Sequence, residues 1–272
     1  MKYPIGIQDF ESIINGGYVY VDKTALVYRL VTEGKIYFLS RPRRFGKSLL
    51  VSTLKAYFKG KKELFNGLAI DGLEKEWAEY PVFHIDFNGE DYTRSGKLEE
   101  KIVGAIETWE AEYGRDPYKQ ALGDRFIYVL AQAARKYGRR SVVLIDEYDK
   151  PLLDVLDTGF STIVDGEKRL LEDHHRNILK GFYSVFKGAD EHLQFVLLTG
   201  VTKFSQVSVF SGFNQHKDIS LDGRYEALCG ITEEELYHVF ADAIERLAVK
   251  YKYTLEQIKE KLKKQYDGYH FS

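Results

Sequence analysis

The sequence predicts an α/β protein in which a parallel five-stranded sheet is sandwiched between helices. Residues 142–145 and 195–198 are continuous apolar runs, which is the pattern of strands buried on both faces of a parallel sheet. Amphipathic stretches of helical length separate the strand-like runs, and this alternation implies parallel crossover connections. With 272 residues, of which 44% are hydrophobic, the chain is long enough to bury a large core.

The expected elements follow one another along the chain. Strands are predicted, in order, at 36–39, 82–87, 142–145, 195–198 and, from a weaker pattern, 218–221. Apolar residues at helical spacing predict amphipathic helices over 98–113, 122–130 and 170–186. Because strands and helices alternate, the helices are expected to cover both faces of the sheet.

Three regions are expected from this pattern. Residues 1–30 are interpreted as an N-terminal extension packed on the core, and residues 31–230 as the core itself. Residues 231–272 have a purely helical pattern, in which the segment 232–235 is a capping signal before the first helix. A second helix is expected over 255–266. This last region is interpreted as a helical lid or the beginning of a winged-helix-like unit.

Composition excludes several classes of function. The net charge of −2 gives no global basic character that would recommend a nucleic acid as partner. The single cysteine, Cys229, rules out an internal disulfide and a cysteine-based metal cluster. The start of the chain has no apolar signal core, and no apolar run approaches the roughly 20 residues of a membrane span. We therefore expect a cytoplasmic protein with no membrane partner.

The loop after the first strand has the order of a phosphate-binding loop. Strand 36–39 leads into a turn, then into Gly46-Lys47-Ser48, and then into an amphipathic helix. In such a loop the helix N-terminus and exposed backbone N–H groups face the anion. The lysine neutralises the terminal phosphates and the following hydroxyl binds magnesium. We therefore expect Lys47 to act on the phosphates and Ser48 to bind the metal.

The entrance of this loop departs from the usual pattern. Arg41 stands where the first glycine is expected, and Pro42 fixes its own φ and lacks an N–H. Arg43 and Arg44 add two permanent charges beside a bound phosphate. An alternative interpretation is an arginine-rich loop that meets acidic residues or nucleic acid. The residues expected to surround the cofactor are Arg41, Pro42, Arg43, Arg44, Phe45, Gly46, Lys47, Ser48 and Leu49.

Two carboxylates follow the third strand. Asp146 and Glu147 come directly after the apolar run 142–145. In a P-loop ATPase the first carboxylate holds magnesium, and the second accepts a proton from the attacking water. Both groups are needed at the carboxyl ends of parallel strands, where ligands gather in open α/β sheets. An acidic loop of no catalytic importance is the alternative, and the pairing with Gly46-Lys47-Ser48 argues against it.

The fourth strand ends at Thr199. ATPases of the additional-strand catalytic-glutamate class insert this strand between the phosphate-loop strand and the acidic strand. In that arrangement Thr199 lies between the two and senses the γ-phosphate or positions water. A threonine that only ends a strand is the alternative interpretation.

Seven segments in order carry a resemblance to a known family. They are "GIQDFESIINGGYVYVDKT", "RPRRFGKSLL", "LIDEYDKPL", "LLTGVTKFS", "VFSGFNQHKDIS", "YEALCGITEEEL" and "YDGYHFS". Together they resemble the bacterial AAA-ATPase-like family, which is related to archaeal ATPases and STAND proteins. The resemblance covers nearly the whole chain. An arginine-rich loop without the first glycine is typical of that family.

The resemblance implies how the site works. It implies ATP binding through Lys47 and Ser48, with Asp146 on Mg²⁺ and Glu147 as the base. Many members continue into a C-terminal domain that resembles PD-(D/E)XK nucleases, and we expect this chain to stop about where that domain begins. A nucleic-acid partner is therefore expected only through that absent domain. A homo-oligomer remains an open interpretation.

Other residues are given less weight. Asp22 with Glu33-Gly34-Lys35 is a weak nuclease-like pattern, because Lys35 leads into the phosphate-loop strand. His174 and His175 fit a core or boundary position better than a metal site. Asp86 is expected to cap the next segment rather than contact magnesium. Arg224 is expected on the surface rather than as an arginine sensor.

Three functions compete at this point. The leading one is magnesium-dependent ATP hydrolysis that moves the helical C-terminal part, with Glu147, Lys47 and Thr199 as catalytic residues. The second is a nucleotide-gated interaction switch with little turnover. The third is the regulatory half of a nuclease that processes nucleic acids. A nucleic-acid binder without nucleotide would need stacking aromatics on a basic surface, and most aromatics here occupy apolar positions.

Overall fold

Five parallel strands form the centre of the molecule. The computed structural model describes residues 2–202 and 216–266. Within them the strands pair in the order β2-β3-β6-β1-β7. These strands are β1 (Ile36–Ser40), β2 (Val82–Asp86), β3 (Ser141–Asp146), β6 (Leu193–Gly200) and β7 (Lys217–Asp218). The predicted α/β fold with a parallel five-stranded sheet is confirmed.

The strand order places the loops of interest side by side. β6 lies between β1 and β3, as the sequence predicts for the fourth strand. All residues of β3 are buried, in agreement with its continuous apolar pattern. The fifth strand is shorter and begins earlier than predicted, because only Lys217 and Asp218 pair with β1.

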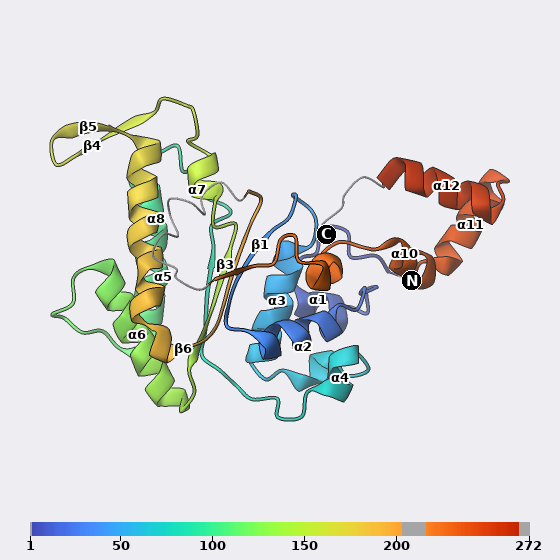
Figure 1. Ribbon diagram of the computed structural model, residues 1–272, viewed down its shortest axis with the longest axis horizontal. Coiled ribbons are helices and arrows are strands. Elements are labelled where there is room, and N and C mark those ends of the chain that lie inside the picture. The colour runs from blue at the N-terminus through green and yellow to red at the C-terminus, as the bar shows by residue number, and fades with distance from the viewer. Residues whose placement is uncertain (1, 203–215, 267–272) are drawn as a thin grey trace.

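Helices cover both faces of the sheet (Figure 1). One face packs against α5 (Lys97–Tyr113), α6 (Leu122–Tyr137) and α8 (Leu171–Gly188). The other face packs against α1 (Phe10–Asn15), α2 (Thr24–Glu33), α3 (Lys47–Phe58) and α4 (Ala69–Leu73). Phe10, Val27 and Leu30 therefore belong to the same apolar cluster as the α3 side chains. The N-terminal residues are thus part of the core packing on this face.

A hairpin that the sequence pattern did not suggest lies between β3 and β6. After the short helix α7 (Lys150–Leu153), strands β4 (Ser161–Val164) and β5 (Glu167–Leu170) pair in antiparallel fashion. Asp165 and Gly166 connect them with φ angles of 53° and 83°, as a two-residue hairpin turn requires. Leu170, which was expected on the stripe of α8, is therefore a strand residue and is exposed.

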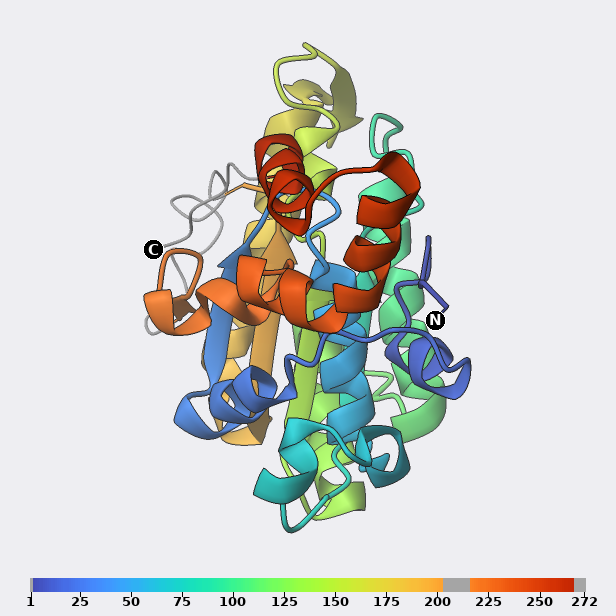
Figure 2. The same cartoon turned by 90° about the vertical axis from the view of Figure 1, so that its right-hand side faces the viewer.

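The C-terminal residues form three helices beside the α1–α4 layer (Figure 2). Thr232 and Glu235 form the predicted capping box before α10 (Glu233–Val239). The single helix expected next is broken at Phe240, so that α11 (Ala241–Tyr251) is separate, and α12 (Leu255–Tyr266) follows. Their own core is small, with Ile244, Ala248 and Ile258 buried. Among the described residues, no helix has the length and apolar character needed to cross a membrane.

Candidate functional site

The loop between β1 and α3 has the backbone that an anion site needs. Gly46 precedes α3 with φ of 86°, a conformation that a side chain would strain. Lys47 is the first helical residue and is 3% exposed, while Ser48 beside it is partly buried. The N-terminus of the twelve-residue α3 therefore opens directly behind the loop. Such a helix end favours negative charge.

The missing first glycine has a structural explanation. Arg41 continues the pairing of β1, since its N–H donates to the carbonyl of Gly200 at 3.1 Å. The positive φ falls instead at Arg44, where it is 66°. The loop therefore makes its tight turn three residues later than the position that glycine usually occupies.

The three arginines of the loop lie in different environments. The guanidinium of Arg41 is buried and donates to the carbonyls of Ser220 at 2.6 Å and Tyr225 at 3.3 Å. Arg43 and Arg44 are exposed. Arg41 therefore fixes the loop against the segment that follows β7, whereas the other two arginines are accessible to a ligand.

The ends of β3 and β6 meet beside this loop. Asp146 is 2% exposed and Thr199 is fully buried. The hydroxyl of Thr199 donates a hydrogen bond to Asp146 Oδ1, and the N–H of Glu147 donates to the same oxygen at 3.1 Å. Thr199 therefore orients the Asp146 carboxylate.

Lys47 and Glu147 bring the two regions into contact. Lys47 Nζ lies 3.4 Å from Glu147 Oε1 and donates to the carbonyls of Arg41 at 3.1 Å and Pro42 at 3.2 Å. Burial raises the pKa of Glu147, an effect that the nearby Lys47 ammonium opposes and the Asp146 carboxylate adds to. Glu147 also has a φ of 53°, which is uncommon for a residue other than glycine. The structure thus brings Lys47, Asp146, Glu147 and Thr199 together.

The oxygen donors at this site suit a magnesium ion that is also bound by substrate phosphates. They are too few for a metal ion held by protein side chains alone. Ser48 and Asp146 offer a hydroxyl and a carboxylate, which are hard ligands. No group of three or more His, Cys, Asp or Glu side chains in the described ranges could hold a metal by itself. Magnesium commonly needs only one or two protein oxygens together with substrate phosphates, so this donor set fits it.

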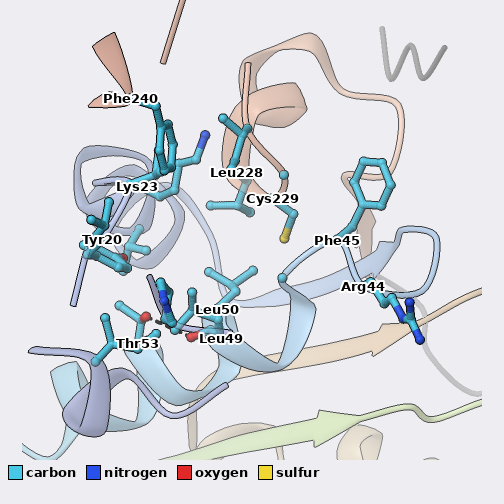
Figure 3. Close-up of a pocket in the computed structure, with 18 residues that line it drawn as sticks. Tyr20, Lys23, Arg44, Phe45, Leu49, Leu50, Thr53, Leu228, Cys229 and Phe240 are labelled. Atoms are coloured by element: carbon cyan, nitrogen blue, oxygen red, sulfur yellow. Dashed lines mark hydrogen bonds between the residues drawn. The ribbon is translucent and has the colours of Figure 1, made fainter. Parts of the chain in front are cut away.

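An apolar pocket adjoins the loop (Figure 3). It has a volume of about 270 Å³ and lies over α3, with Leu49, Leu50 and Thr53 on one side and Leu228, Cys229 and Phe240 on the other. Tyr20 and Lys23 line it from the N-terminal segment. Lys23 also forms an ion pair at 2.5 Å with Glu235 of α10.

The pocket is joined to the phosphate loop through the backbone. Arg44, Phe45 and Gly46 line both features, and the N–H of Gly230 donates to the carbonyl of Phe45 at 2.8 Å. Burial raises the pKa of the Cys229 thiol to about 11, so this side chain is an uncharged part of the wall. Sequence reasoning missed the pocket. Two distant segments, around Tyr20 and around Cys229, line the pocket. In the sequence each of them was noticeable only as part of the family resemblance.

The weak nuclease-like pattern is not assembled. Asp22 accepts hydrogen bonds from Thr24, before α2, whereas Glu33 is the last residue of that helix. The ten-residue helix α2, which ends at Glu33, sets the two carboxylates roughly 15 Å apart. Lys35 pairs with Asp190 at 2.6 Å instead of either carboxylate.

The remaining singled-out residues have structural partners. His175 is buried against the carbonyl of Pro151, and His174 bonds Glu99 at 2.6 Å. Asp86 accepts from the N–H of Asn88 at 2.8 Å, so it caps the next segment. Arg224 is exposed and pairs with Asp222 at 2.6 Å. Parts of "LLTGVTKFS", "VFSGFNQHKDIS" and "YDGYHFS" lie outside the described residues.

Similarity to known proteins extends over most of the chain. A family model described as "Predicted AAA-ATPase" matches residues 4–210. An uncharacterized protein in the vnfD 5′ region of Azotobacter chroococcum mcd 1 is 43% identical over 242 residues, which is 88% of this chain. The match spans 45% of that relative's length. No solved structure matches significantly.

Proposed function

Because the chain belongs to the AAA-ATPase-like family, we propose that it binds magnesium-ATP at the β1–α3 loop and hydrolyses it. The observation that carries the proposal is the meeting of Lys47 and Glu147 at 3.4 Å, where the phosphate loop and the acidic end of β3 come together. A cation at a helix N-terminus and a carboxylate base after a nearby strand are two of the groups that phosphoryl transfer to water uses.

On the phosphate side, each residue of the loop has a distinct role. Backbone N–H groups from Phe45 to Ser48 face the phosphates, and Lys47 exchanges its carbonyl and Glu147 partners for phosphate oxygens. Arg43 and Arg44 add positive charge from exposed positions. Ser48 and Asp146 hold Mg²⁺, which supplies charge neutralisation at the phosphates when it is bound with the nucleotide.

On the catalytic side, Glu147 accepts the proton of the attacking water. Its burial favours the neutral carboxyl, and the approach of Lys47 favours the carboxylate. Thr199 holds Asp146 by a hydrogen bond, and we assign it the further role of positioning a water near the phosphates. The position of β6 between β1 and β3 supports assignment to the additional-strand catalytic-glutamate class.

We assign the apolar pocket to the nucleobase of ATP. It begins at the loop itself and is lined by Leu49, Leu50 and Phe240. Ligand pockets are typically lined by apolar side chains with a few polar groups, and a planar purine suits such a wall. One ATP molecule would thus lie with its base over α3 and its phosphates at the N-terminus of that helix.

The residues that line the pocket are also an argument for our proposal that nucleotide binding moves the C-terminal part, residues 231–272. Phe240 and the Lys23–Glu235 ion pair link the pocket to α10 and α11. A base entering between α3 and Phe240 changes the contacts of these helices, which fits a lid on a core of residues 31–230 with residues 1–30 as an extension. This link also favours the second candidate, a nucleotide-gated switch with little turnover.

Calorimetry with magnesium-ATP tests the proposal. Lys47→Ala is expected to weaken binding strongly, because the charge on the terminal phosphates is lost, while the fold stays intact. Arg43→Ala and Arg44→Ala are expected to weaken binding less, and Arg140→Ala, which removes an exposed arginine from the far end of β3, serves as control. Unchanged affinity in Lys47→Ala would contradict the site.

A further inference from the structure

The three-residue turn after β3, residues 147–149, is hydrogen-bonded to residues 199–202 at the end of β6. Asp149 is 1% exposed, and its Oδ2 accepts hydrogen bonds from the N–H of Val201 at 2.9 Å, the N–H of Thr202 at 2.7 Å and the hydroxyl of Thr202 at 2.9 Å. A carboxylate that accepts from two successive backbone N–H groups and a hydroxyl fixes that backbone closely, because hydrogen bonds to charged groups are the strong ones.

Tyr148 adds a second set of contacts to the same segment. Its N–H donates to the carbonyl of Thr199 at 2.9 Å, and its hydroxyl donates to the carbonyl of Thr202 at 2.6 Å. Its ring lies edge-on to Phe38 of β1 and fills the space above Gly200. A Cβ on Gly200 would come 2.3 Å from this ring, so only glycine fits there.

Glu147 lies between Asp146 and these contacts, and its backbone has the uncommon left-handed conformation. A residue in such a conformation costs of order 1–3 kcal/mol and persists where the surrounding structure holds it. Here both neighbours are held. Asp146 is bonded to Thr199, and Tyr148 with Asp149 is bonded to residues 199–202. The backbone of Glu147 is therefore fixed from both sides.

We propose that Asp149 is a positioning residue that sets the conformation of Glu147 by holding the turn after β3 against the end of β6. This inference rests on the proposed ATP hydrolysis. It adds to that proposal a residue that touches neither nucleotide nor metal.

The location of the Asp149 side chain agrees with this role. Its second oxygen, Oδ1, has no hydrogen-bond partner among the described residues and lies close to the backbone of Gly200. Burial raises the pKa of Asp149, while the bonds from Thr202 and Val201 favour its charged form.

A double-mutant cycle on turnover tests the proposal. Asp149→Ala is expected to lower kcat by about 10-fold to 10²-fold, because a small misplacement of a catalytic group has that effect. The affinity for magnesium-ATP is expected to change less than about threefold. In a Glu147→Gln background the same substitution is expected to add less than about twofold, since a residue that acts through Glu147 has nothing left to position.

Further variants distinguish a positioning role of Asp149 from a general loss of stability. Asp149→Asn retains an acceptor oxygen and is expected to recover part of the lost kcat, and Thr202→Val removes only the hydroxyl donor and should cost least. Asp154→Ala removes a carboxylate from the same region whose partner is Lys150, so it is expected to leave kcat unchanged. Thermal unfolding of each variant identifies any that fail to fold.

The outcomes separate the two proposals. Losses of kcat that multiply in the double variant, or equal losses in kcat and affinity, would overturn the positioning role alone. Absence of turnover in the wild-type chain would overturn the proposed hydrolysis and this role with it.

Discussion

Two regions contact the phosphate loop, and they differ in the chemistry of their side chains. On one side the ends of β3 and β6 bury charged and polar groups: Thr199 donates a hydrogen bond to Asp146, and Asp149 accepts one from the N–H of Val201. On the other side the pocket over α3 is lined mainly by apolar side chains, with Lys23 engaged by Glu235. The hydrogen bonds of the first region suit the proposed chemistry, and the apolar side chains of the second suit the proposed contact with the base.

The difference predicts which property each region controls. Substitutions at the polar side should change turnover with little effect on affinity. Substitutions at the apolar side should change affinity and its dependence on the base. The following predictions test that division, beginning with the largest effect.

Glu147→Gln is expected to lower kcat by about 10²-fold or more, because it keeps the shape of the side chain and removes the base. Affinity for magnesium-ATP should be kept or improved, since Lys47 loses a competing charged partner. Phosphate release and calorimetry measure the two quantities. Equal turnover in the variant and the wild type would show that another group is the base.

Gly200→Ala is expected to destabilise the fold by about 1–3 kcal/mol, the usual cost of overpacking. Its Cβ would overlap the Tyr148 ring and Asp149, both of which are buried. Thermal unfolding measures the loss, with Gly104→Ala as control because nothing lies within 4 Å of a Cβ there. Wild-type stability in Gly200→Ala would mean that Tyr148 is not packed against this strand.

The pH dependence of turnover should report the burial of Glu147. Because burial raises its pKa, the carboxyl holds its proton to a higher pH than an ordinary glutamate and cannot act as base while protonated. The acid limb of kcat/KM is therefore expected at a pH above the ordinary glutamate range, with activity rising as pH increases through it. An acid limb at the ordinary glutamate pKa would contradict a buried base.

Lys23→Ala is expected to have the smallest effect, a change of about two- to fivefold in the affinity for ATP. A partly exposed ion pair contributes at most about 1 kcal/mol, so its loss loosens the pocket wall without unfolding it. Lys61→Ala removes an ion pair with Glu11 away from the pocket and is the control. If both variants changed the affinity for ATP equally, the Lys23–Glu235 ion pair would have no specific role in nucleotide binding.

Sequence reasoning found the polar side because its residues are local to strand ends. Gly46-Lys47-Ser48, Asp146 and Glu147 each follow a recognisable apolar run, and parallel strands bring their carboxyl ends to one edge. The path of the loop entrance was not predictable, because the positive φ moved to Arg44, a residue type that rarely adopts it.

The apolar side escaped prediction because its wall comes from segments more than two hundred residues apart. Tyr20 and Phe240 have ordinary core patterns, and only the fold places them around one pocket. The break at Phe240 was hidden as well, since the helical spacing of apolar residues continues across it. The Asp165-Gly166 turn did carry a readable hairpin signal, which the helix-like stripe after it obscured.

If one ATP molecule spans both regions, magnesium-ATP and magnesium-tripolyphosphate should respond differently to substitutions in the pocket, and calorimetry compares the two ligands. Lys47→Ala is expected to weaken both ligands. Phe240→Ala is expected to weaken ATP alone, because only ATP carries a base, and Tyr251→Ala, an exposed aromatic of α11, is the matched control. Equal binding of ATP by Phe240→Ala and the wild type, or an equal loss for both ligands, would show that the base does not lie in the pocket.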